Sequence, residues 1–461
     1  MIDIDIKRID SILEEVVRNM GGKETQLVVV TKKIQAIDPI RFFERAKKLE
    51  ENRVFWASAD GSFCVAGVGE QIEITTTHTN DQQMNHVWNE LTKQAVVYNP
   101  YNVIGTGLFA IGGMDFDPLS ERTALWKNFK PSQFIVPKYF ITRHMDSFFY
   151  TVSLQVNKSA NITELVEELA QVEAELLGGS DENRIAATVA QHQVIEPEQW
   201  RDTVQLAVDE IKKDKFRKVV LARELRLKLD KEAEIGSILN RLLTTQPNSY
   251  VFAFEKKQDC FLGATPERLV KVEGNQLFST CLAGTAARGQ GEKEDAEIAM
   301  TELLNDEKNL EEHGYVVKMI QDAITPYCTD IKIADAPIVL TLKNLQHLYT
   351  PVSAQLKKEF TIFDIIYALH PTPALGGVPT DKSLQFIRDY ELLDRGWYGA
   401  PVGWLDGKQN GEFAVAIRSG LIQGEEASLF AGCGVMKDSD PWKEFEETSI
   451  KFLPMLSVLG G

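Results

Sequence analysis

The fold of this chain is decided by residues 431–451, which read AGCGVM (431–436), KDSD (437–440) and PWKEFEETSIK (441–451). The first six residues are typical of a short apolar strand that contains glycines. A helix is predicted from Pro441 onward, because the N–H that proline lacks would have no partner in the first turn of a helix. Glu444, Glu447 and Lys451 lie three and four residues apart, so the predicted helix carries all three on one face.

This predicted helix brings two carboxylates close together. At a spacing of three residues, Glu444 and Glu447 lie about 5–6 Å apart and repel each other by about 3 kcal/mol at an effective dielectric constant near 20. An exposed acidic face is the ordinary explanation, because water relieves the repulsion. A bound cation would also relieve it, and the preceding glycines allow a ligand to approach the backbone. The stretch therefore supports two interpretations, a solvated helix face and a metal and anion site.

Composition limits the class of protein. The 461 residues suffice for two or three ordinary domains or for one large α/β domain. No apolar run could span a membrane, and the acidic N-terminus lacks the pattern of a signal peptide. A net charge of −17 argues against nucleic acid and anionic membranes as partners. The five cysteines show no paired spacing that would indicate zinc or disulfides, and a cytoplasmic protein is expected.

Periodicity gives a coarse map of the chain. Short strands divided by turns are predicted between 26 and 156. Gly178-Gly179-Ser180-Asp181 is the candidate linker between an N-terminal half, 1–180, and a C-terminal half, 181–461. Apolar residues at helical spacing predict helices at 7–20, 40–50, 81–95, 162–177, 197–213 and 294–324.

Lys218 begins a predicted strand whose pattern is clear. Val219, Leu221, Leu225 and Leu227 alternate and form one apolar face. Lys218 falls on the opposite face, so the pattern alone predicts a lysine that points to solvent.

Three other polar residues have ordinary interpretations of their own. Glu267 follows a Thr-Pro pair and is typical of a carboxylate at the start of a helix. A lone histidine such as His313 is more often structural than a ligand. Arg418 lies among apolar residues, where an unpaired guanidinium is costly, so we expect an anionic partner for it.

Seven short motifs follow one another in the second half of the chain. They are KVVLAR (218–223), TPERL (265–269), AGT (283–285), EH (312–313), HPTPALGG (370–377), AIR (416–418) and AGCG with EFEET (431–434 and 444–448). The motifs occur in the order found in the chorismate-utilising enzymes, and the chain resembles this family. The family includes isochorismate, salicylate, anthranilate and aminodeoxychorismate synthases. The resemblance is close over 200–460 and looser in the N-terminal half, chiefly at 108–117.

The resemblance implies an α/β (α+β) fold in which residues 1–461 form a single large domain. Two antiparallel sheets would stack with helices outside them, and the C-terminal half, 181–461, would carry the active site. The candidate linker at 178–181 would then be an internal connection.

The resemblance also implies a set of site residues. Glu312 and Glu447 match direct Mg²⁺ ligands, while Glu444 and Asn309 match positions that hold the waters of the metal. Asn309 stands where many members have an acidic residue. Oxygen ligands suit Mg²⁺, and arginine offers a planar fork to carboxylates. The positions that match substrate-binding residues are Tyr398, Arg418, Gly432 and Lys451 for the carboxylates of chorismate, and Gly284, Thr285 and His370 around its ring.

Two further positions, Lys218 and Ala283, distinguish the reactions within the family. Lys218 stands where the nitrogen-adding members typically have glutamine, and Ala283 stands where aminodeoxychorismate synthases have a nucleophilic lysine. The resemblance therefore implies water as the nucleophile, with Lys218 as the base that activates it and Glu267 as the acid that protonates the departing C4 hydroxyl. A non-catalytic relative would be expected to have lost Glu267 or a metal glutamate, and both remain.

These positions imply an isochorismate synthase, with Mg²⁺ as cofactor and chorismate as substrate, of the type found in the menaquinone pathway. A salicylate synthase or a siderophore-pathway isochorismate synthase is the alternative. No glutaminase subunit is expected.

Overall fold

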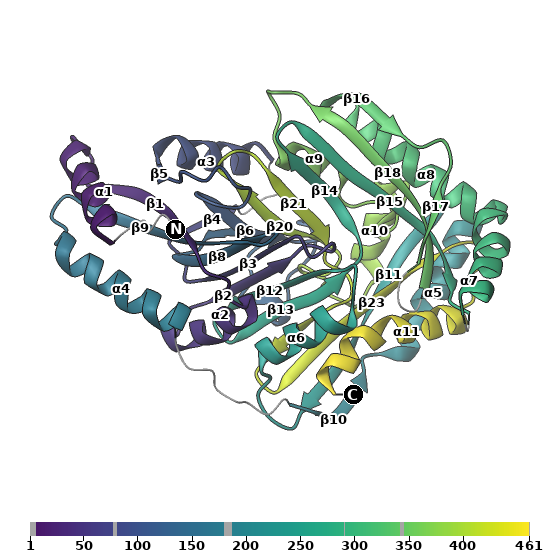
Figure 1. Ribbon diagram of the computed structural model, residues 1–461. Helices are drawn as coiled ribbons and strands as arrows, with labels where there is room; N and C mark the ends of the chain where they lie inside the picture. Colours follow the sequence, from purple (N-terminus) through teal and green to yellow (C-terminus); the bar gives the residue numbers. More distant parts are fainter. Residues whose placement is uncertain (1–5, 77–80, 179–186, 290, 342–344, 461) are drawn as a thin grey trace.

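Two large β-sheets pack face to face in the computed structural model, which describes residues 6–76, 81–178, 187–289, 291–341 and 345–460 (Figure 1). The first sheet has 13 strands. In spatial order they are β10 (Val189–Val194), β11 (Lys218–Leu229), β23 (Glu426–Val435), β22 (Ser419–Gln423), β13 (Asp259–Thr265), β12 (Tyr250–Lys256), β2 (Arg53–Ala57), β3 (Phe63–Val68), β8 (Tyr139–His144), β9 (Ser147–Asn157), β1 (Thr25–Ile34) and β5 (Val96–Tyr98), with β19 (Gly377–Val378) paired to β11.

The second sheet has 10 strands. Within the described residues every strand pair of the two sheets is antiparallel except β1 with β5. Both sheets contain strands from 1–180 and from 181–461. The order in the second sheet is β16 (Cys328–Ile333), β18 (Leu345–Leu356), β15 (Gln276–Ala287), β14 (Arg268–Glu273), β21 (Gly411–Val415), β20 (Pro401–Asp406), β6 (Phe109–Met114), β7 (Ser132–Val136) and β4 (Ile72–Thr76), with β17 (Ile338–Thr341) paired to β18.

Helices cover the outer faces of the sheets (Figure 1). Aromatic side chains fill the space between the sheets, where Phe109 stacks on Trp404 with ring centroids 5.6 Å apart. The helices are α1 (Ile6–Asn19), α2 (Pro39–Arg45), α3 (Asp81–Gln94), α4 (Ile162–Gly178), α5 (Pro197–Lys212), α6 (Ile235–Thr245), α7 (Glu292–Ile298), α8 (Glu307–Ile324), α9 (Ile362–Leu369), α10 (Thr380–Tyr390) and α11 (Pro441–Leu459), with the short 3₁₀ turns η1 (Ala46–Leu49) and η2 (Ala124–Trp126) and the π-helical turn η3 (Ala299–Leu304).

The boundaries confirm some predictions and correct others. α11 begins at Pro441 as predicted, and the Asp440 side chain caps it by accepting hydrogen bonds from Trp442 N and Lys443 N, both at 3.0 Å. The predicted helix at 294–324 is wrong as one element. It divides into α7, η3 and α8. The break before α8 arises because Asp306 leaves the helical conformation and caps α8, where its side chain accepts from Asn309 N at 2.7 Å. Of the candidate linker, Gly178 ends α4 and residues 179–181 lie outside the described residues.

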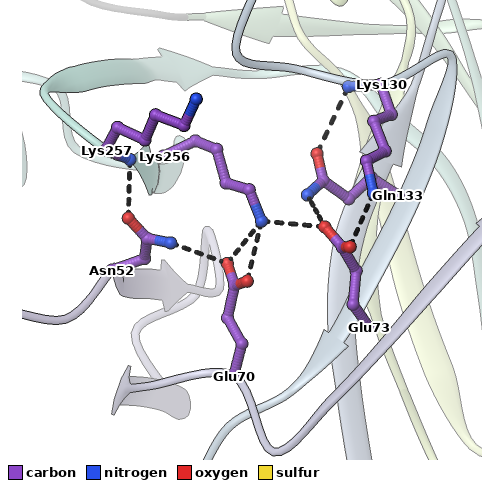
Figure 2. A network of polar contacts seen from close by, with 7 residues as sticks. All are labelled: Asn52, Glu70, Glu73, Lys130, Gln133, Lys256 and Lys257. Carbon is purple, nitrogen blue, oxygen red and sulfur yellow. Dashed lines mark hydrogen bonds and ion pairs between the residues drawn. The ribbon is translucent and has the colours of Figure 1, made fainter.

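A polar cluster joins β12 of the first sheet to β4 of the second (Figure 2). Lys256 on β12 donates to both carboxylate oxygens of Glu70, at 2.8 and 2.7 Å, and to Glu73 on β4 at 2.8 Å. Lys130 also donates to Glu73, at 2.6 Å. Burial would raise the pKa of Glu73, but the hydrogen bonds and charges of these lysines outweigh it and lower that pKa to about 2. Glu73 therefore remains charged across the neutral range.

Candidate active site

A cavity of about 280 Å³ lies where β11, β23 and α11 meet the second sheet. The described residues in its walls include many of those that the sequence singles out. They are Lys218, Glu267, Gly284, Asn309, Tyr398, Arg418, Gly432, Glu447 and Lys451.

Lys218 enters the cavity from β11. Its side chain is only 9% exposed, so the solvent-facing lysine predicted from the strand pattern is wrong. The neighbouring strand provides the space, because a Cβ on Gly434 would lie 2.7 Å from Lys218 Cε. The backbone oxygen of Lys218 accepts a hydrogen bond from Ser383 Oγ at 2.8 Å. A glycine on β23 thus allows a long cationic side chain to lie over the sheet and reach the cavity.

Glu267 lies in the turn between β13 and β14, so the predicted helix start is wrong. Its N–H donates to Thr265 Oγ1 at 3.2 Å, and its carbonyl accepts from Val415 N at 3.0 Å. Burial raises the pKa of the Glu267 carboxyl to about 7, against the lowering effect of the positive charges of Lys218 and Arg418. Such a carboxyl can hold a proton at neutral pH and donate it.

Two cationic side chains form the opposite wall. Arg418 has a left-handed backbone with φ of 52°, and its Nη1 donates to Lys451 O at 3.5 Å. Among the described side chains, no carboxylate forms an ion pair with Arg418. Burial lowers its pKa, whereas Tyr398, Glu447 and Glu267 act in the opposite direction. The anionic partner that the sequence predicts for Arg418 would therefore have to be a bound ligand.

Lys451 Nζ lies between a backbone oxygen and a carboxylate. It donates to Gly432 O at 2.9 Å and pairs with Glu447 Oε1 at 2.6 Å. The hydroxyl of Tyr398 lies 3.4 Å from the position that a Cβ on Gly432 would occupy. Gly432 therefore leaves room beside two groups that can donate hydrogen bonds to an anion.

Helix α11 is held in place by Arg223 of β11. Its Nε donates to Thr448 Oγ1 at 2.7 Å and its Nη2 to Phe445 O at 3.1 Å, while its guanidinium lies 4.0 Å from the centre of the Phe445 ring. Burial lowers the pKa of Arg223 to about 10. This contact fixes the helix that carries Glu444, Glu447 and Lys451 against the strand that carries Lys218.

The carboxylates of α11 are suited to a hard cation. Burial raises the pKa of Glu444, and repulsion from Glu447 adds to this rise, against hydrogen bonds from Ser439 and Cys433. A magnesium ion prefers oxygen ligands and would relieve that repulsion. Glu312 belongs to α8, but its side chain and that of Thr285 lie outside the structural description. Within the described residues no group of three acidic, histidine or cysteine side chains forms a metal site.

Gly284 and Asn309 contact each other in the cavity wall, whereas two predicted histidines lie outside it. Gly284 bends β15 with φ of 77°, and Asn309 Oδ1 lies 3.3 Å from the position of an added Cβ there. Asn309 Nδ2 donates to Glu302 O at 2.7 Å. His370 does not line the cavity: its Nε2 bonds Phe116 O at 3.0 Å, and burial lowers its pKa to about 4. His313 is structural, as expected, with Nε2 2.8 Å from Thr350 Oγ1.

His347 on β18 lines the cavity and was not predicted from the sequence. It is 8% exposed, and its Nδ1 lies 3.3 Å from Gly284 O. Burial, followed by repulsion from Arg418, lowers the pKa of His347 to about 4, so the ring is neutral at pH 7. Its strand is opposite β15, with His347 in register with Thr285. The signal available in the sequence was a histidine within the strand-like run LQHLY (345–349).

The chain is similar to known proteins over nearly its whole length. The family model described as chorismate binding enzyme matches residues 12–460. The chain is 41% identical over 444 residues to the isochorismate synthase MenF of Bacillus subtilis, with 94% of each chain covered. It is 33% identical to the salicylate biosynthesis isochorismate synthase of Pseudomonas aeruginosa, over 94% of this chain and 91% of that protein.

Solved structures show the same fold. The menaquinone-specific isochorismate synthase MenF from Escherichia coli superposes with a TM-score of 0.79 at 23% identity, covering 98% of this chain and 99% of that one. Anthranilate synthase component I from Streptococcus pneumoniae superposes with a TM-score of 0.65 at 18% identity, covering 94% and 92%. The predicted fold of two stacked antiparallel sheets with helices outside is confirmed.

The chain therefore belongs to the chorismate-binding enzyme family. Among the helices of the described residues, none combines the length and the apolar character needed to cross a bilayer.

Proposed function

We propose that the chain is an isochorismate synthase, an isomerase that moves a hydroxyl group of chorismate from C4 to C2. The observation that carries this proposal is the placement of Lys218 and Glu267 in one cavity with Arg418 and Lys451. A base and an acid face a space that also offers two cations to a dianionic substrate. The identity of 41% to a MenF isochorismate synthase over 94% of the chain supports the same reaction.

The proposed reaction balances without an external oxidant or reductant. Lys218 takes a proton from a water molecule as the water oxygen forms a bond to C2. The two ring double bonds each shift by one position, and the C4–O bond breaks. Glu267 gives its proton to the departing hydroxyl, which leaves as water. One water is added and one is lost, so the reaction is an isomerisation.

The other residues of the cavity bind and orient the substrate. Arg418, Lys451 and the Tyr398 hydroxyl offer hydrogen bonds to carboxylates, and a carboxylate accepts two parallel bonds from a guanidinium. Glu312, Glu444 and Glu447 are the residues that would hold Mg²⁺, with Asn309 toward its waters. When bound, the ion supplies positive charge to the ring carboxylate. Gly284 and the backbone of Thr285 would lie beside the ring.

Product analysis tests the proposal directly. Purified protein incubated with chorismate and Mg²⁺ should give isochorismate in a mixture with chorismate, because the two isomers are close in energy. Chromatography with standards identifies both compounds. Salicylate and pyruvate as the main products would instead favour a salicylate synthase, and anthranilate formed with ammonia would favour nitrogen transfer.

The pKa of Glu267 gives a prediction about pH. Only the protonated form can act as the acid, so kcat/KM should fall about tenfold per pH unit above about pH 7. Measuring kcat/KM from about pH 6 to about pH 9 checks this limb. The folded state raises the pKa of Glu267 from 4.5 to about 7, so this group also affects stability. Its contribution to the free energy of unfolding is fully present below about pH 4.5 and is lost as the pH rises through about 7.

Glu267→Gln provides the matched test of that assignment. The variant should lose roughly 100-fold or more in kcat, because the amide has no proton to give. At pH 8 it should unfold at a higher denaturant concentration than the parent, since a neutral amide replaces a buried carboxylate. A variant with unchanged kcat, or a parent with a flat profile through pH 7, would contradict the role of Glu267.

The pathway, the partners and the location stay proposals. Similarity to MenF proteins over nearly the whole chain supports a place in menaquinone biosynthesis. A siderophore-pathway role is the alternative. We expect no glutaminase subunit, no nucleic acid partner, no membrane association, and a cytoplasmic location.

A further inference from the structure

The outer edge of β11 lacks a neighbouring strand at the point where it enters the active site. β19 pairs with Lys218 and Val219, and β10 pairs with the far end of β11 from Leu225 onward. Between them the strand has β23 on one side only. Backbone groups at Val220 and Ala222 that point to the open side therefore need other partners.

Two of those groups are satisfied elsewhere, since Val220 N donates to Gly376 O at 3.1 Å and Ala222 O accepts from Trp200 Nε1 at 3.0 Å. A buried ion pair supplies the partners of the other two, Val220 O and Ala222 N. Arg395 donates through Nε and Nη2 to the two carboxylate oxygens of Glu391, both at 2.6 Å, and the side chains are 5% and 1% exposed. Arg395 Nη2 also donates to Val220 O at 2.7 Å. Glu391 Oε2 accepts from Ala222 N at 2.8 Å. The pair thus occupies part of the place that a strand would take beside β11.

The same arginine also holds a wall of the cavity. Its Nη1 donates to Leu375 O at 3.1 Å, and its guanidinium lies 4.2 Å from the centre of the Phe116 ring. Leu375 and Val220 both line the cavity, and Val220 is two residues from Lys218. Neither Arg395 nor Glu391 lines the cavity, and the Arg395 side chain reaches its wall through the backbone of Leu375 and Val220. The Arg395 carbonyl also accepts from Tyr398 N at 2.7 Å. One fixed guanidinium therefore connects the strand that carries the proposed base with the loop around Leu375, which leads into β19.

We propose that Arg395 and Glu391 are positioning residues, which fix the distance between Lys218 and the substrate by holding β11 and the Leu375 loop together. The inference rests on the proposed function, because the effect on turnover requires Lys218 to be the base. A buried pair of this kind is weak evidence for stability alone, since well-packed apolar residues often serve as well. The planar guanidinium of Arg395 holds its hydrogen-bond partners in fixed directions, which no apolar pair can do.

Arg395→Lys is the test variant, because lysine keeps the charge but cannot bond Glu391, Val220 and Leu375 together in the same fixed geometry. We expect kcat to fall roughly 10- to 100-fold while KM for chorismate changes little, since a shift of about 1 Å at a reacting group has an effect of this size. Glu391→Gln should also lower kcat with little change in KM, but by a smaller factor.

The chain offers a matched control in Arg53→Lys. Arg53 forms the same bidentate contact, with Glu255 at 2.6 Å for both bonds. It also donates to a backbone oxygen, Phe43 O, at 2.9 Å, and lies 4.2 Å from the Phe43 ring centre. It does not line the active-site cavity. The control should lose stability comparable to that lost in the test variant, yet keep its kcat.

A second measurement is independent of activity. Hydrogen exchange of the full chain, followed by mass spectrometry, should show faster exchange of the β11 peptide that contains Ala222 in Arg395→Lys, and no change there in Arg53→Lys. Folded Arg395→Lys with parental kcat or parental exchange in that peptide would overturn the inference, as would an equal loss of kcat in the control. Parental protein that makes no isochorismate would overturn the proposed function instead, and the exchange result would still decide whether the pair holds β11.

Discussion

Replacing Lys218 with alanine should lower the kcat of isochorismate formation by roughly 100-fold or more. The variant removes the one group in the proposed scheme that takes a proton from water. Binding should persist, because Arg418 and Lys451 rather than Lys218 are assigned to the substrate carboxylates. Steady-state kinetics give kcat, and titration with chorismate in the presence of Mg²⁺ gives the binding constant of the variant.

Lys228→Ala is the control for this prediction. Lys228 lies on the same strand and the same side of its alternation, but it is exposed at the far end of β11. Its loss should leave kcat and the denaturation midpoint close to those of the parent. Near-normal isochorismate formation by Lys218→Ala would show that the buried lysine is structural, and the base would have to be sought elsewhere in the cavity.

Removal of the metal should have an effect of similar size. Activity should vanish in excess chelator and return with added Mg²⁺. Glu447→Gln should weaken Mg²⁺ binding sharply, because the amide lacks the charge that the ion requires. Titration calorimetry measures the binding of Mg²⁺ directly, independently of turnover. The substitution also removes the partner of Lys451 at 2.6 Å, so the affinity for chorismate should be measured beside it.

The neighbouring Glu446 offers the matched control. It is exposed on the same helix, one residue away, and does not line the cavity. Glu446→Gln should bind Mg²⁺ as the parent does. Full activity of the parent in excess chelator, or equal Mg²⁺ binding by both glutamine variants, would reject the metal site on α11.

The resemblance predicted the fold class and most of the charged and polar residues around the cavity, whereas local pattern failed at the residues with the most chemistry. Lys218 appears solvent-facing because alternation assumes that one face of a strand meets water. Both faces of β11 are covered near its start, from Lys218 to Leu225. Glu267 resembles a helix cap because a Thr-Pro pair is equally compatible with a tight turn between two strands.

Contacts that depend on distant strands could not be predicted from local sequence. His347 reaches the cavity through the register of β18 with β15, and no spacing within its own strand indicates that partner. The break between η3 and α8 depends on Asp306, whose preference for capping competes with an apolar stripe that continues past it. The motifs place Glu312 on α8, and its role as a ligand stays a prediction.

The pairing of β11 with β23 has a consequence for how the protein is made on the ribosome. β11 is synthesised midway through the chain, but its partner β23 and the helix α11 follow only at 426–459. Chains grow by about 5–20 residues per second, so the lysine-bearing strand waits for roughly ten seconds or longer before its neighbour exists. During that interval an apolar strand edge is available to other nascent chains. Assembly of the cavity is thus a late event, and a shortened product that ends before β23 would expose aggregation-prone strands without forming the cavity.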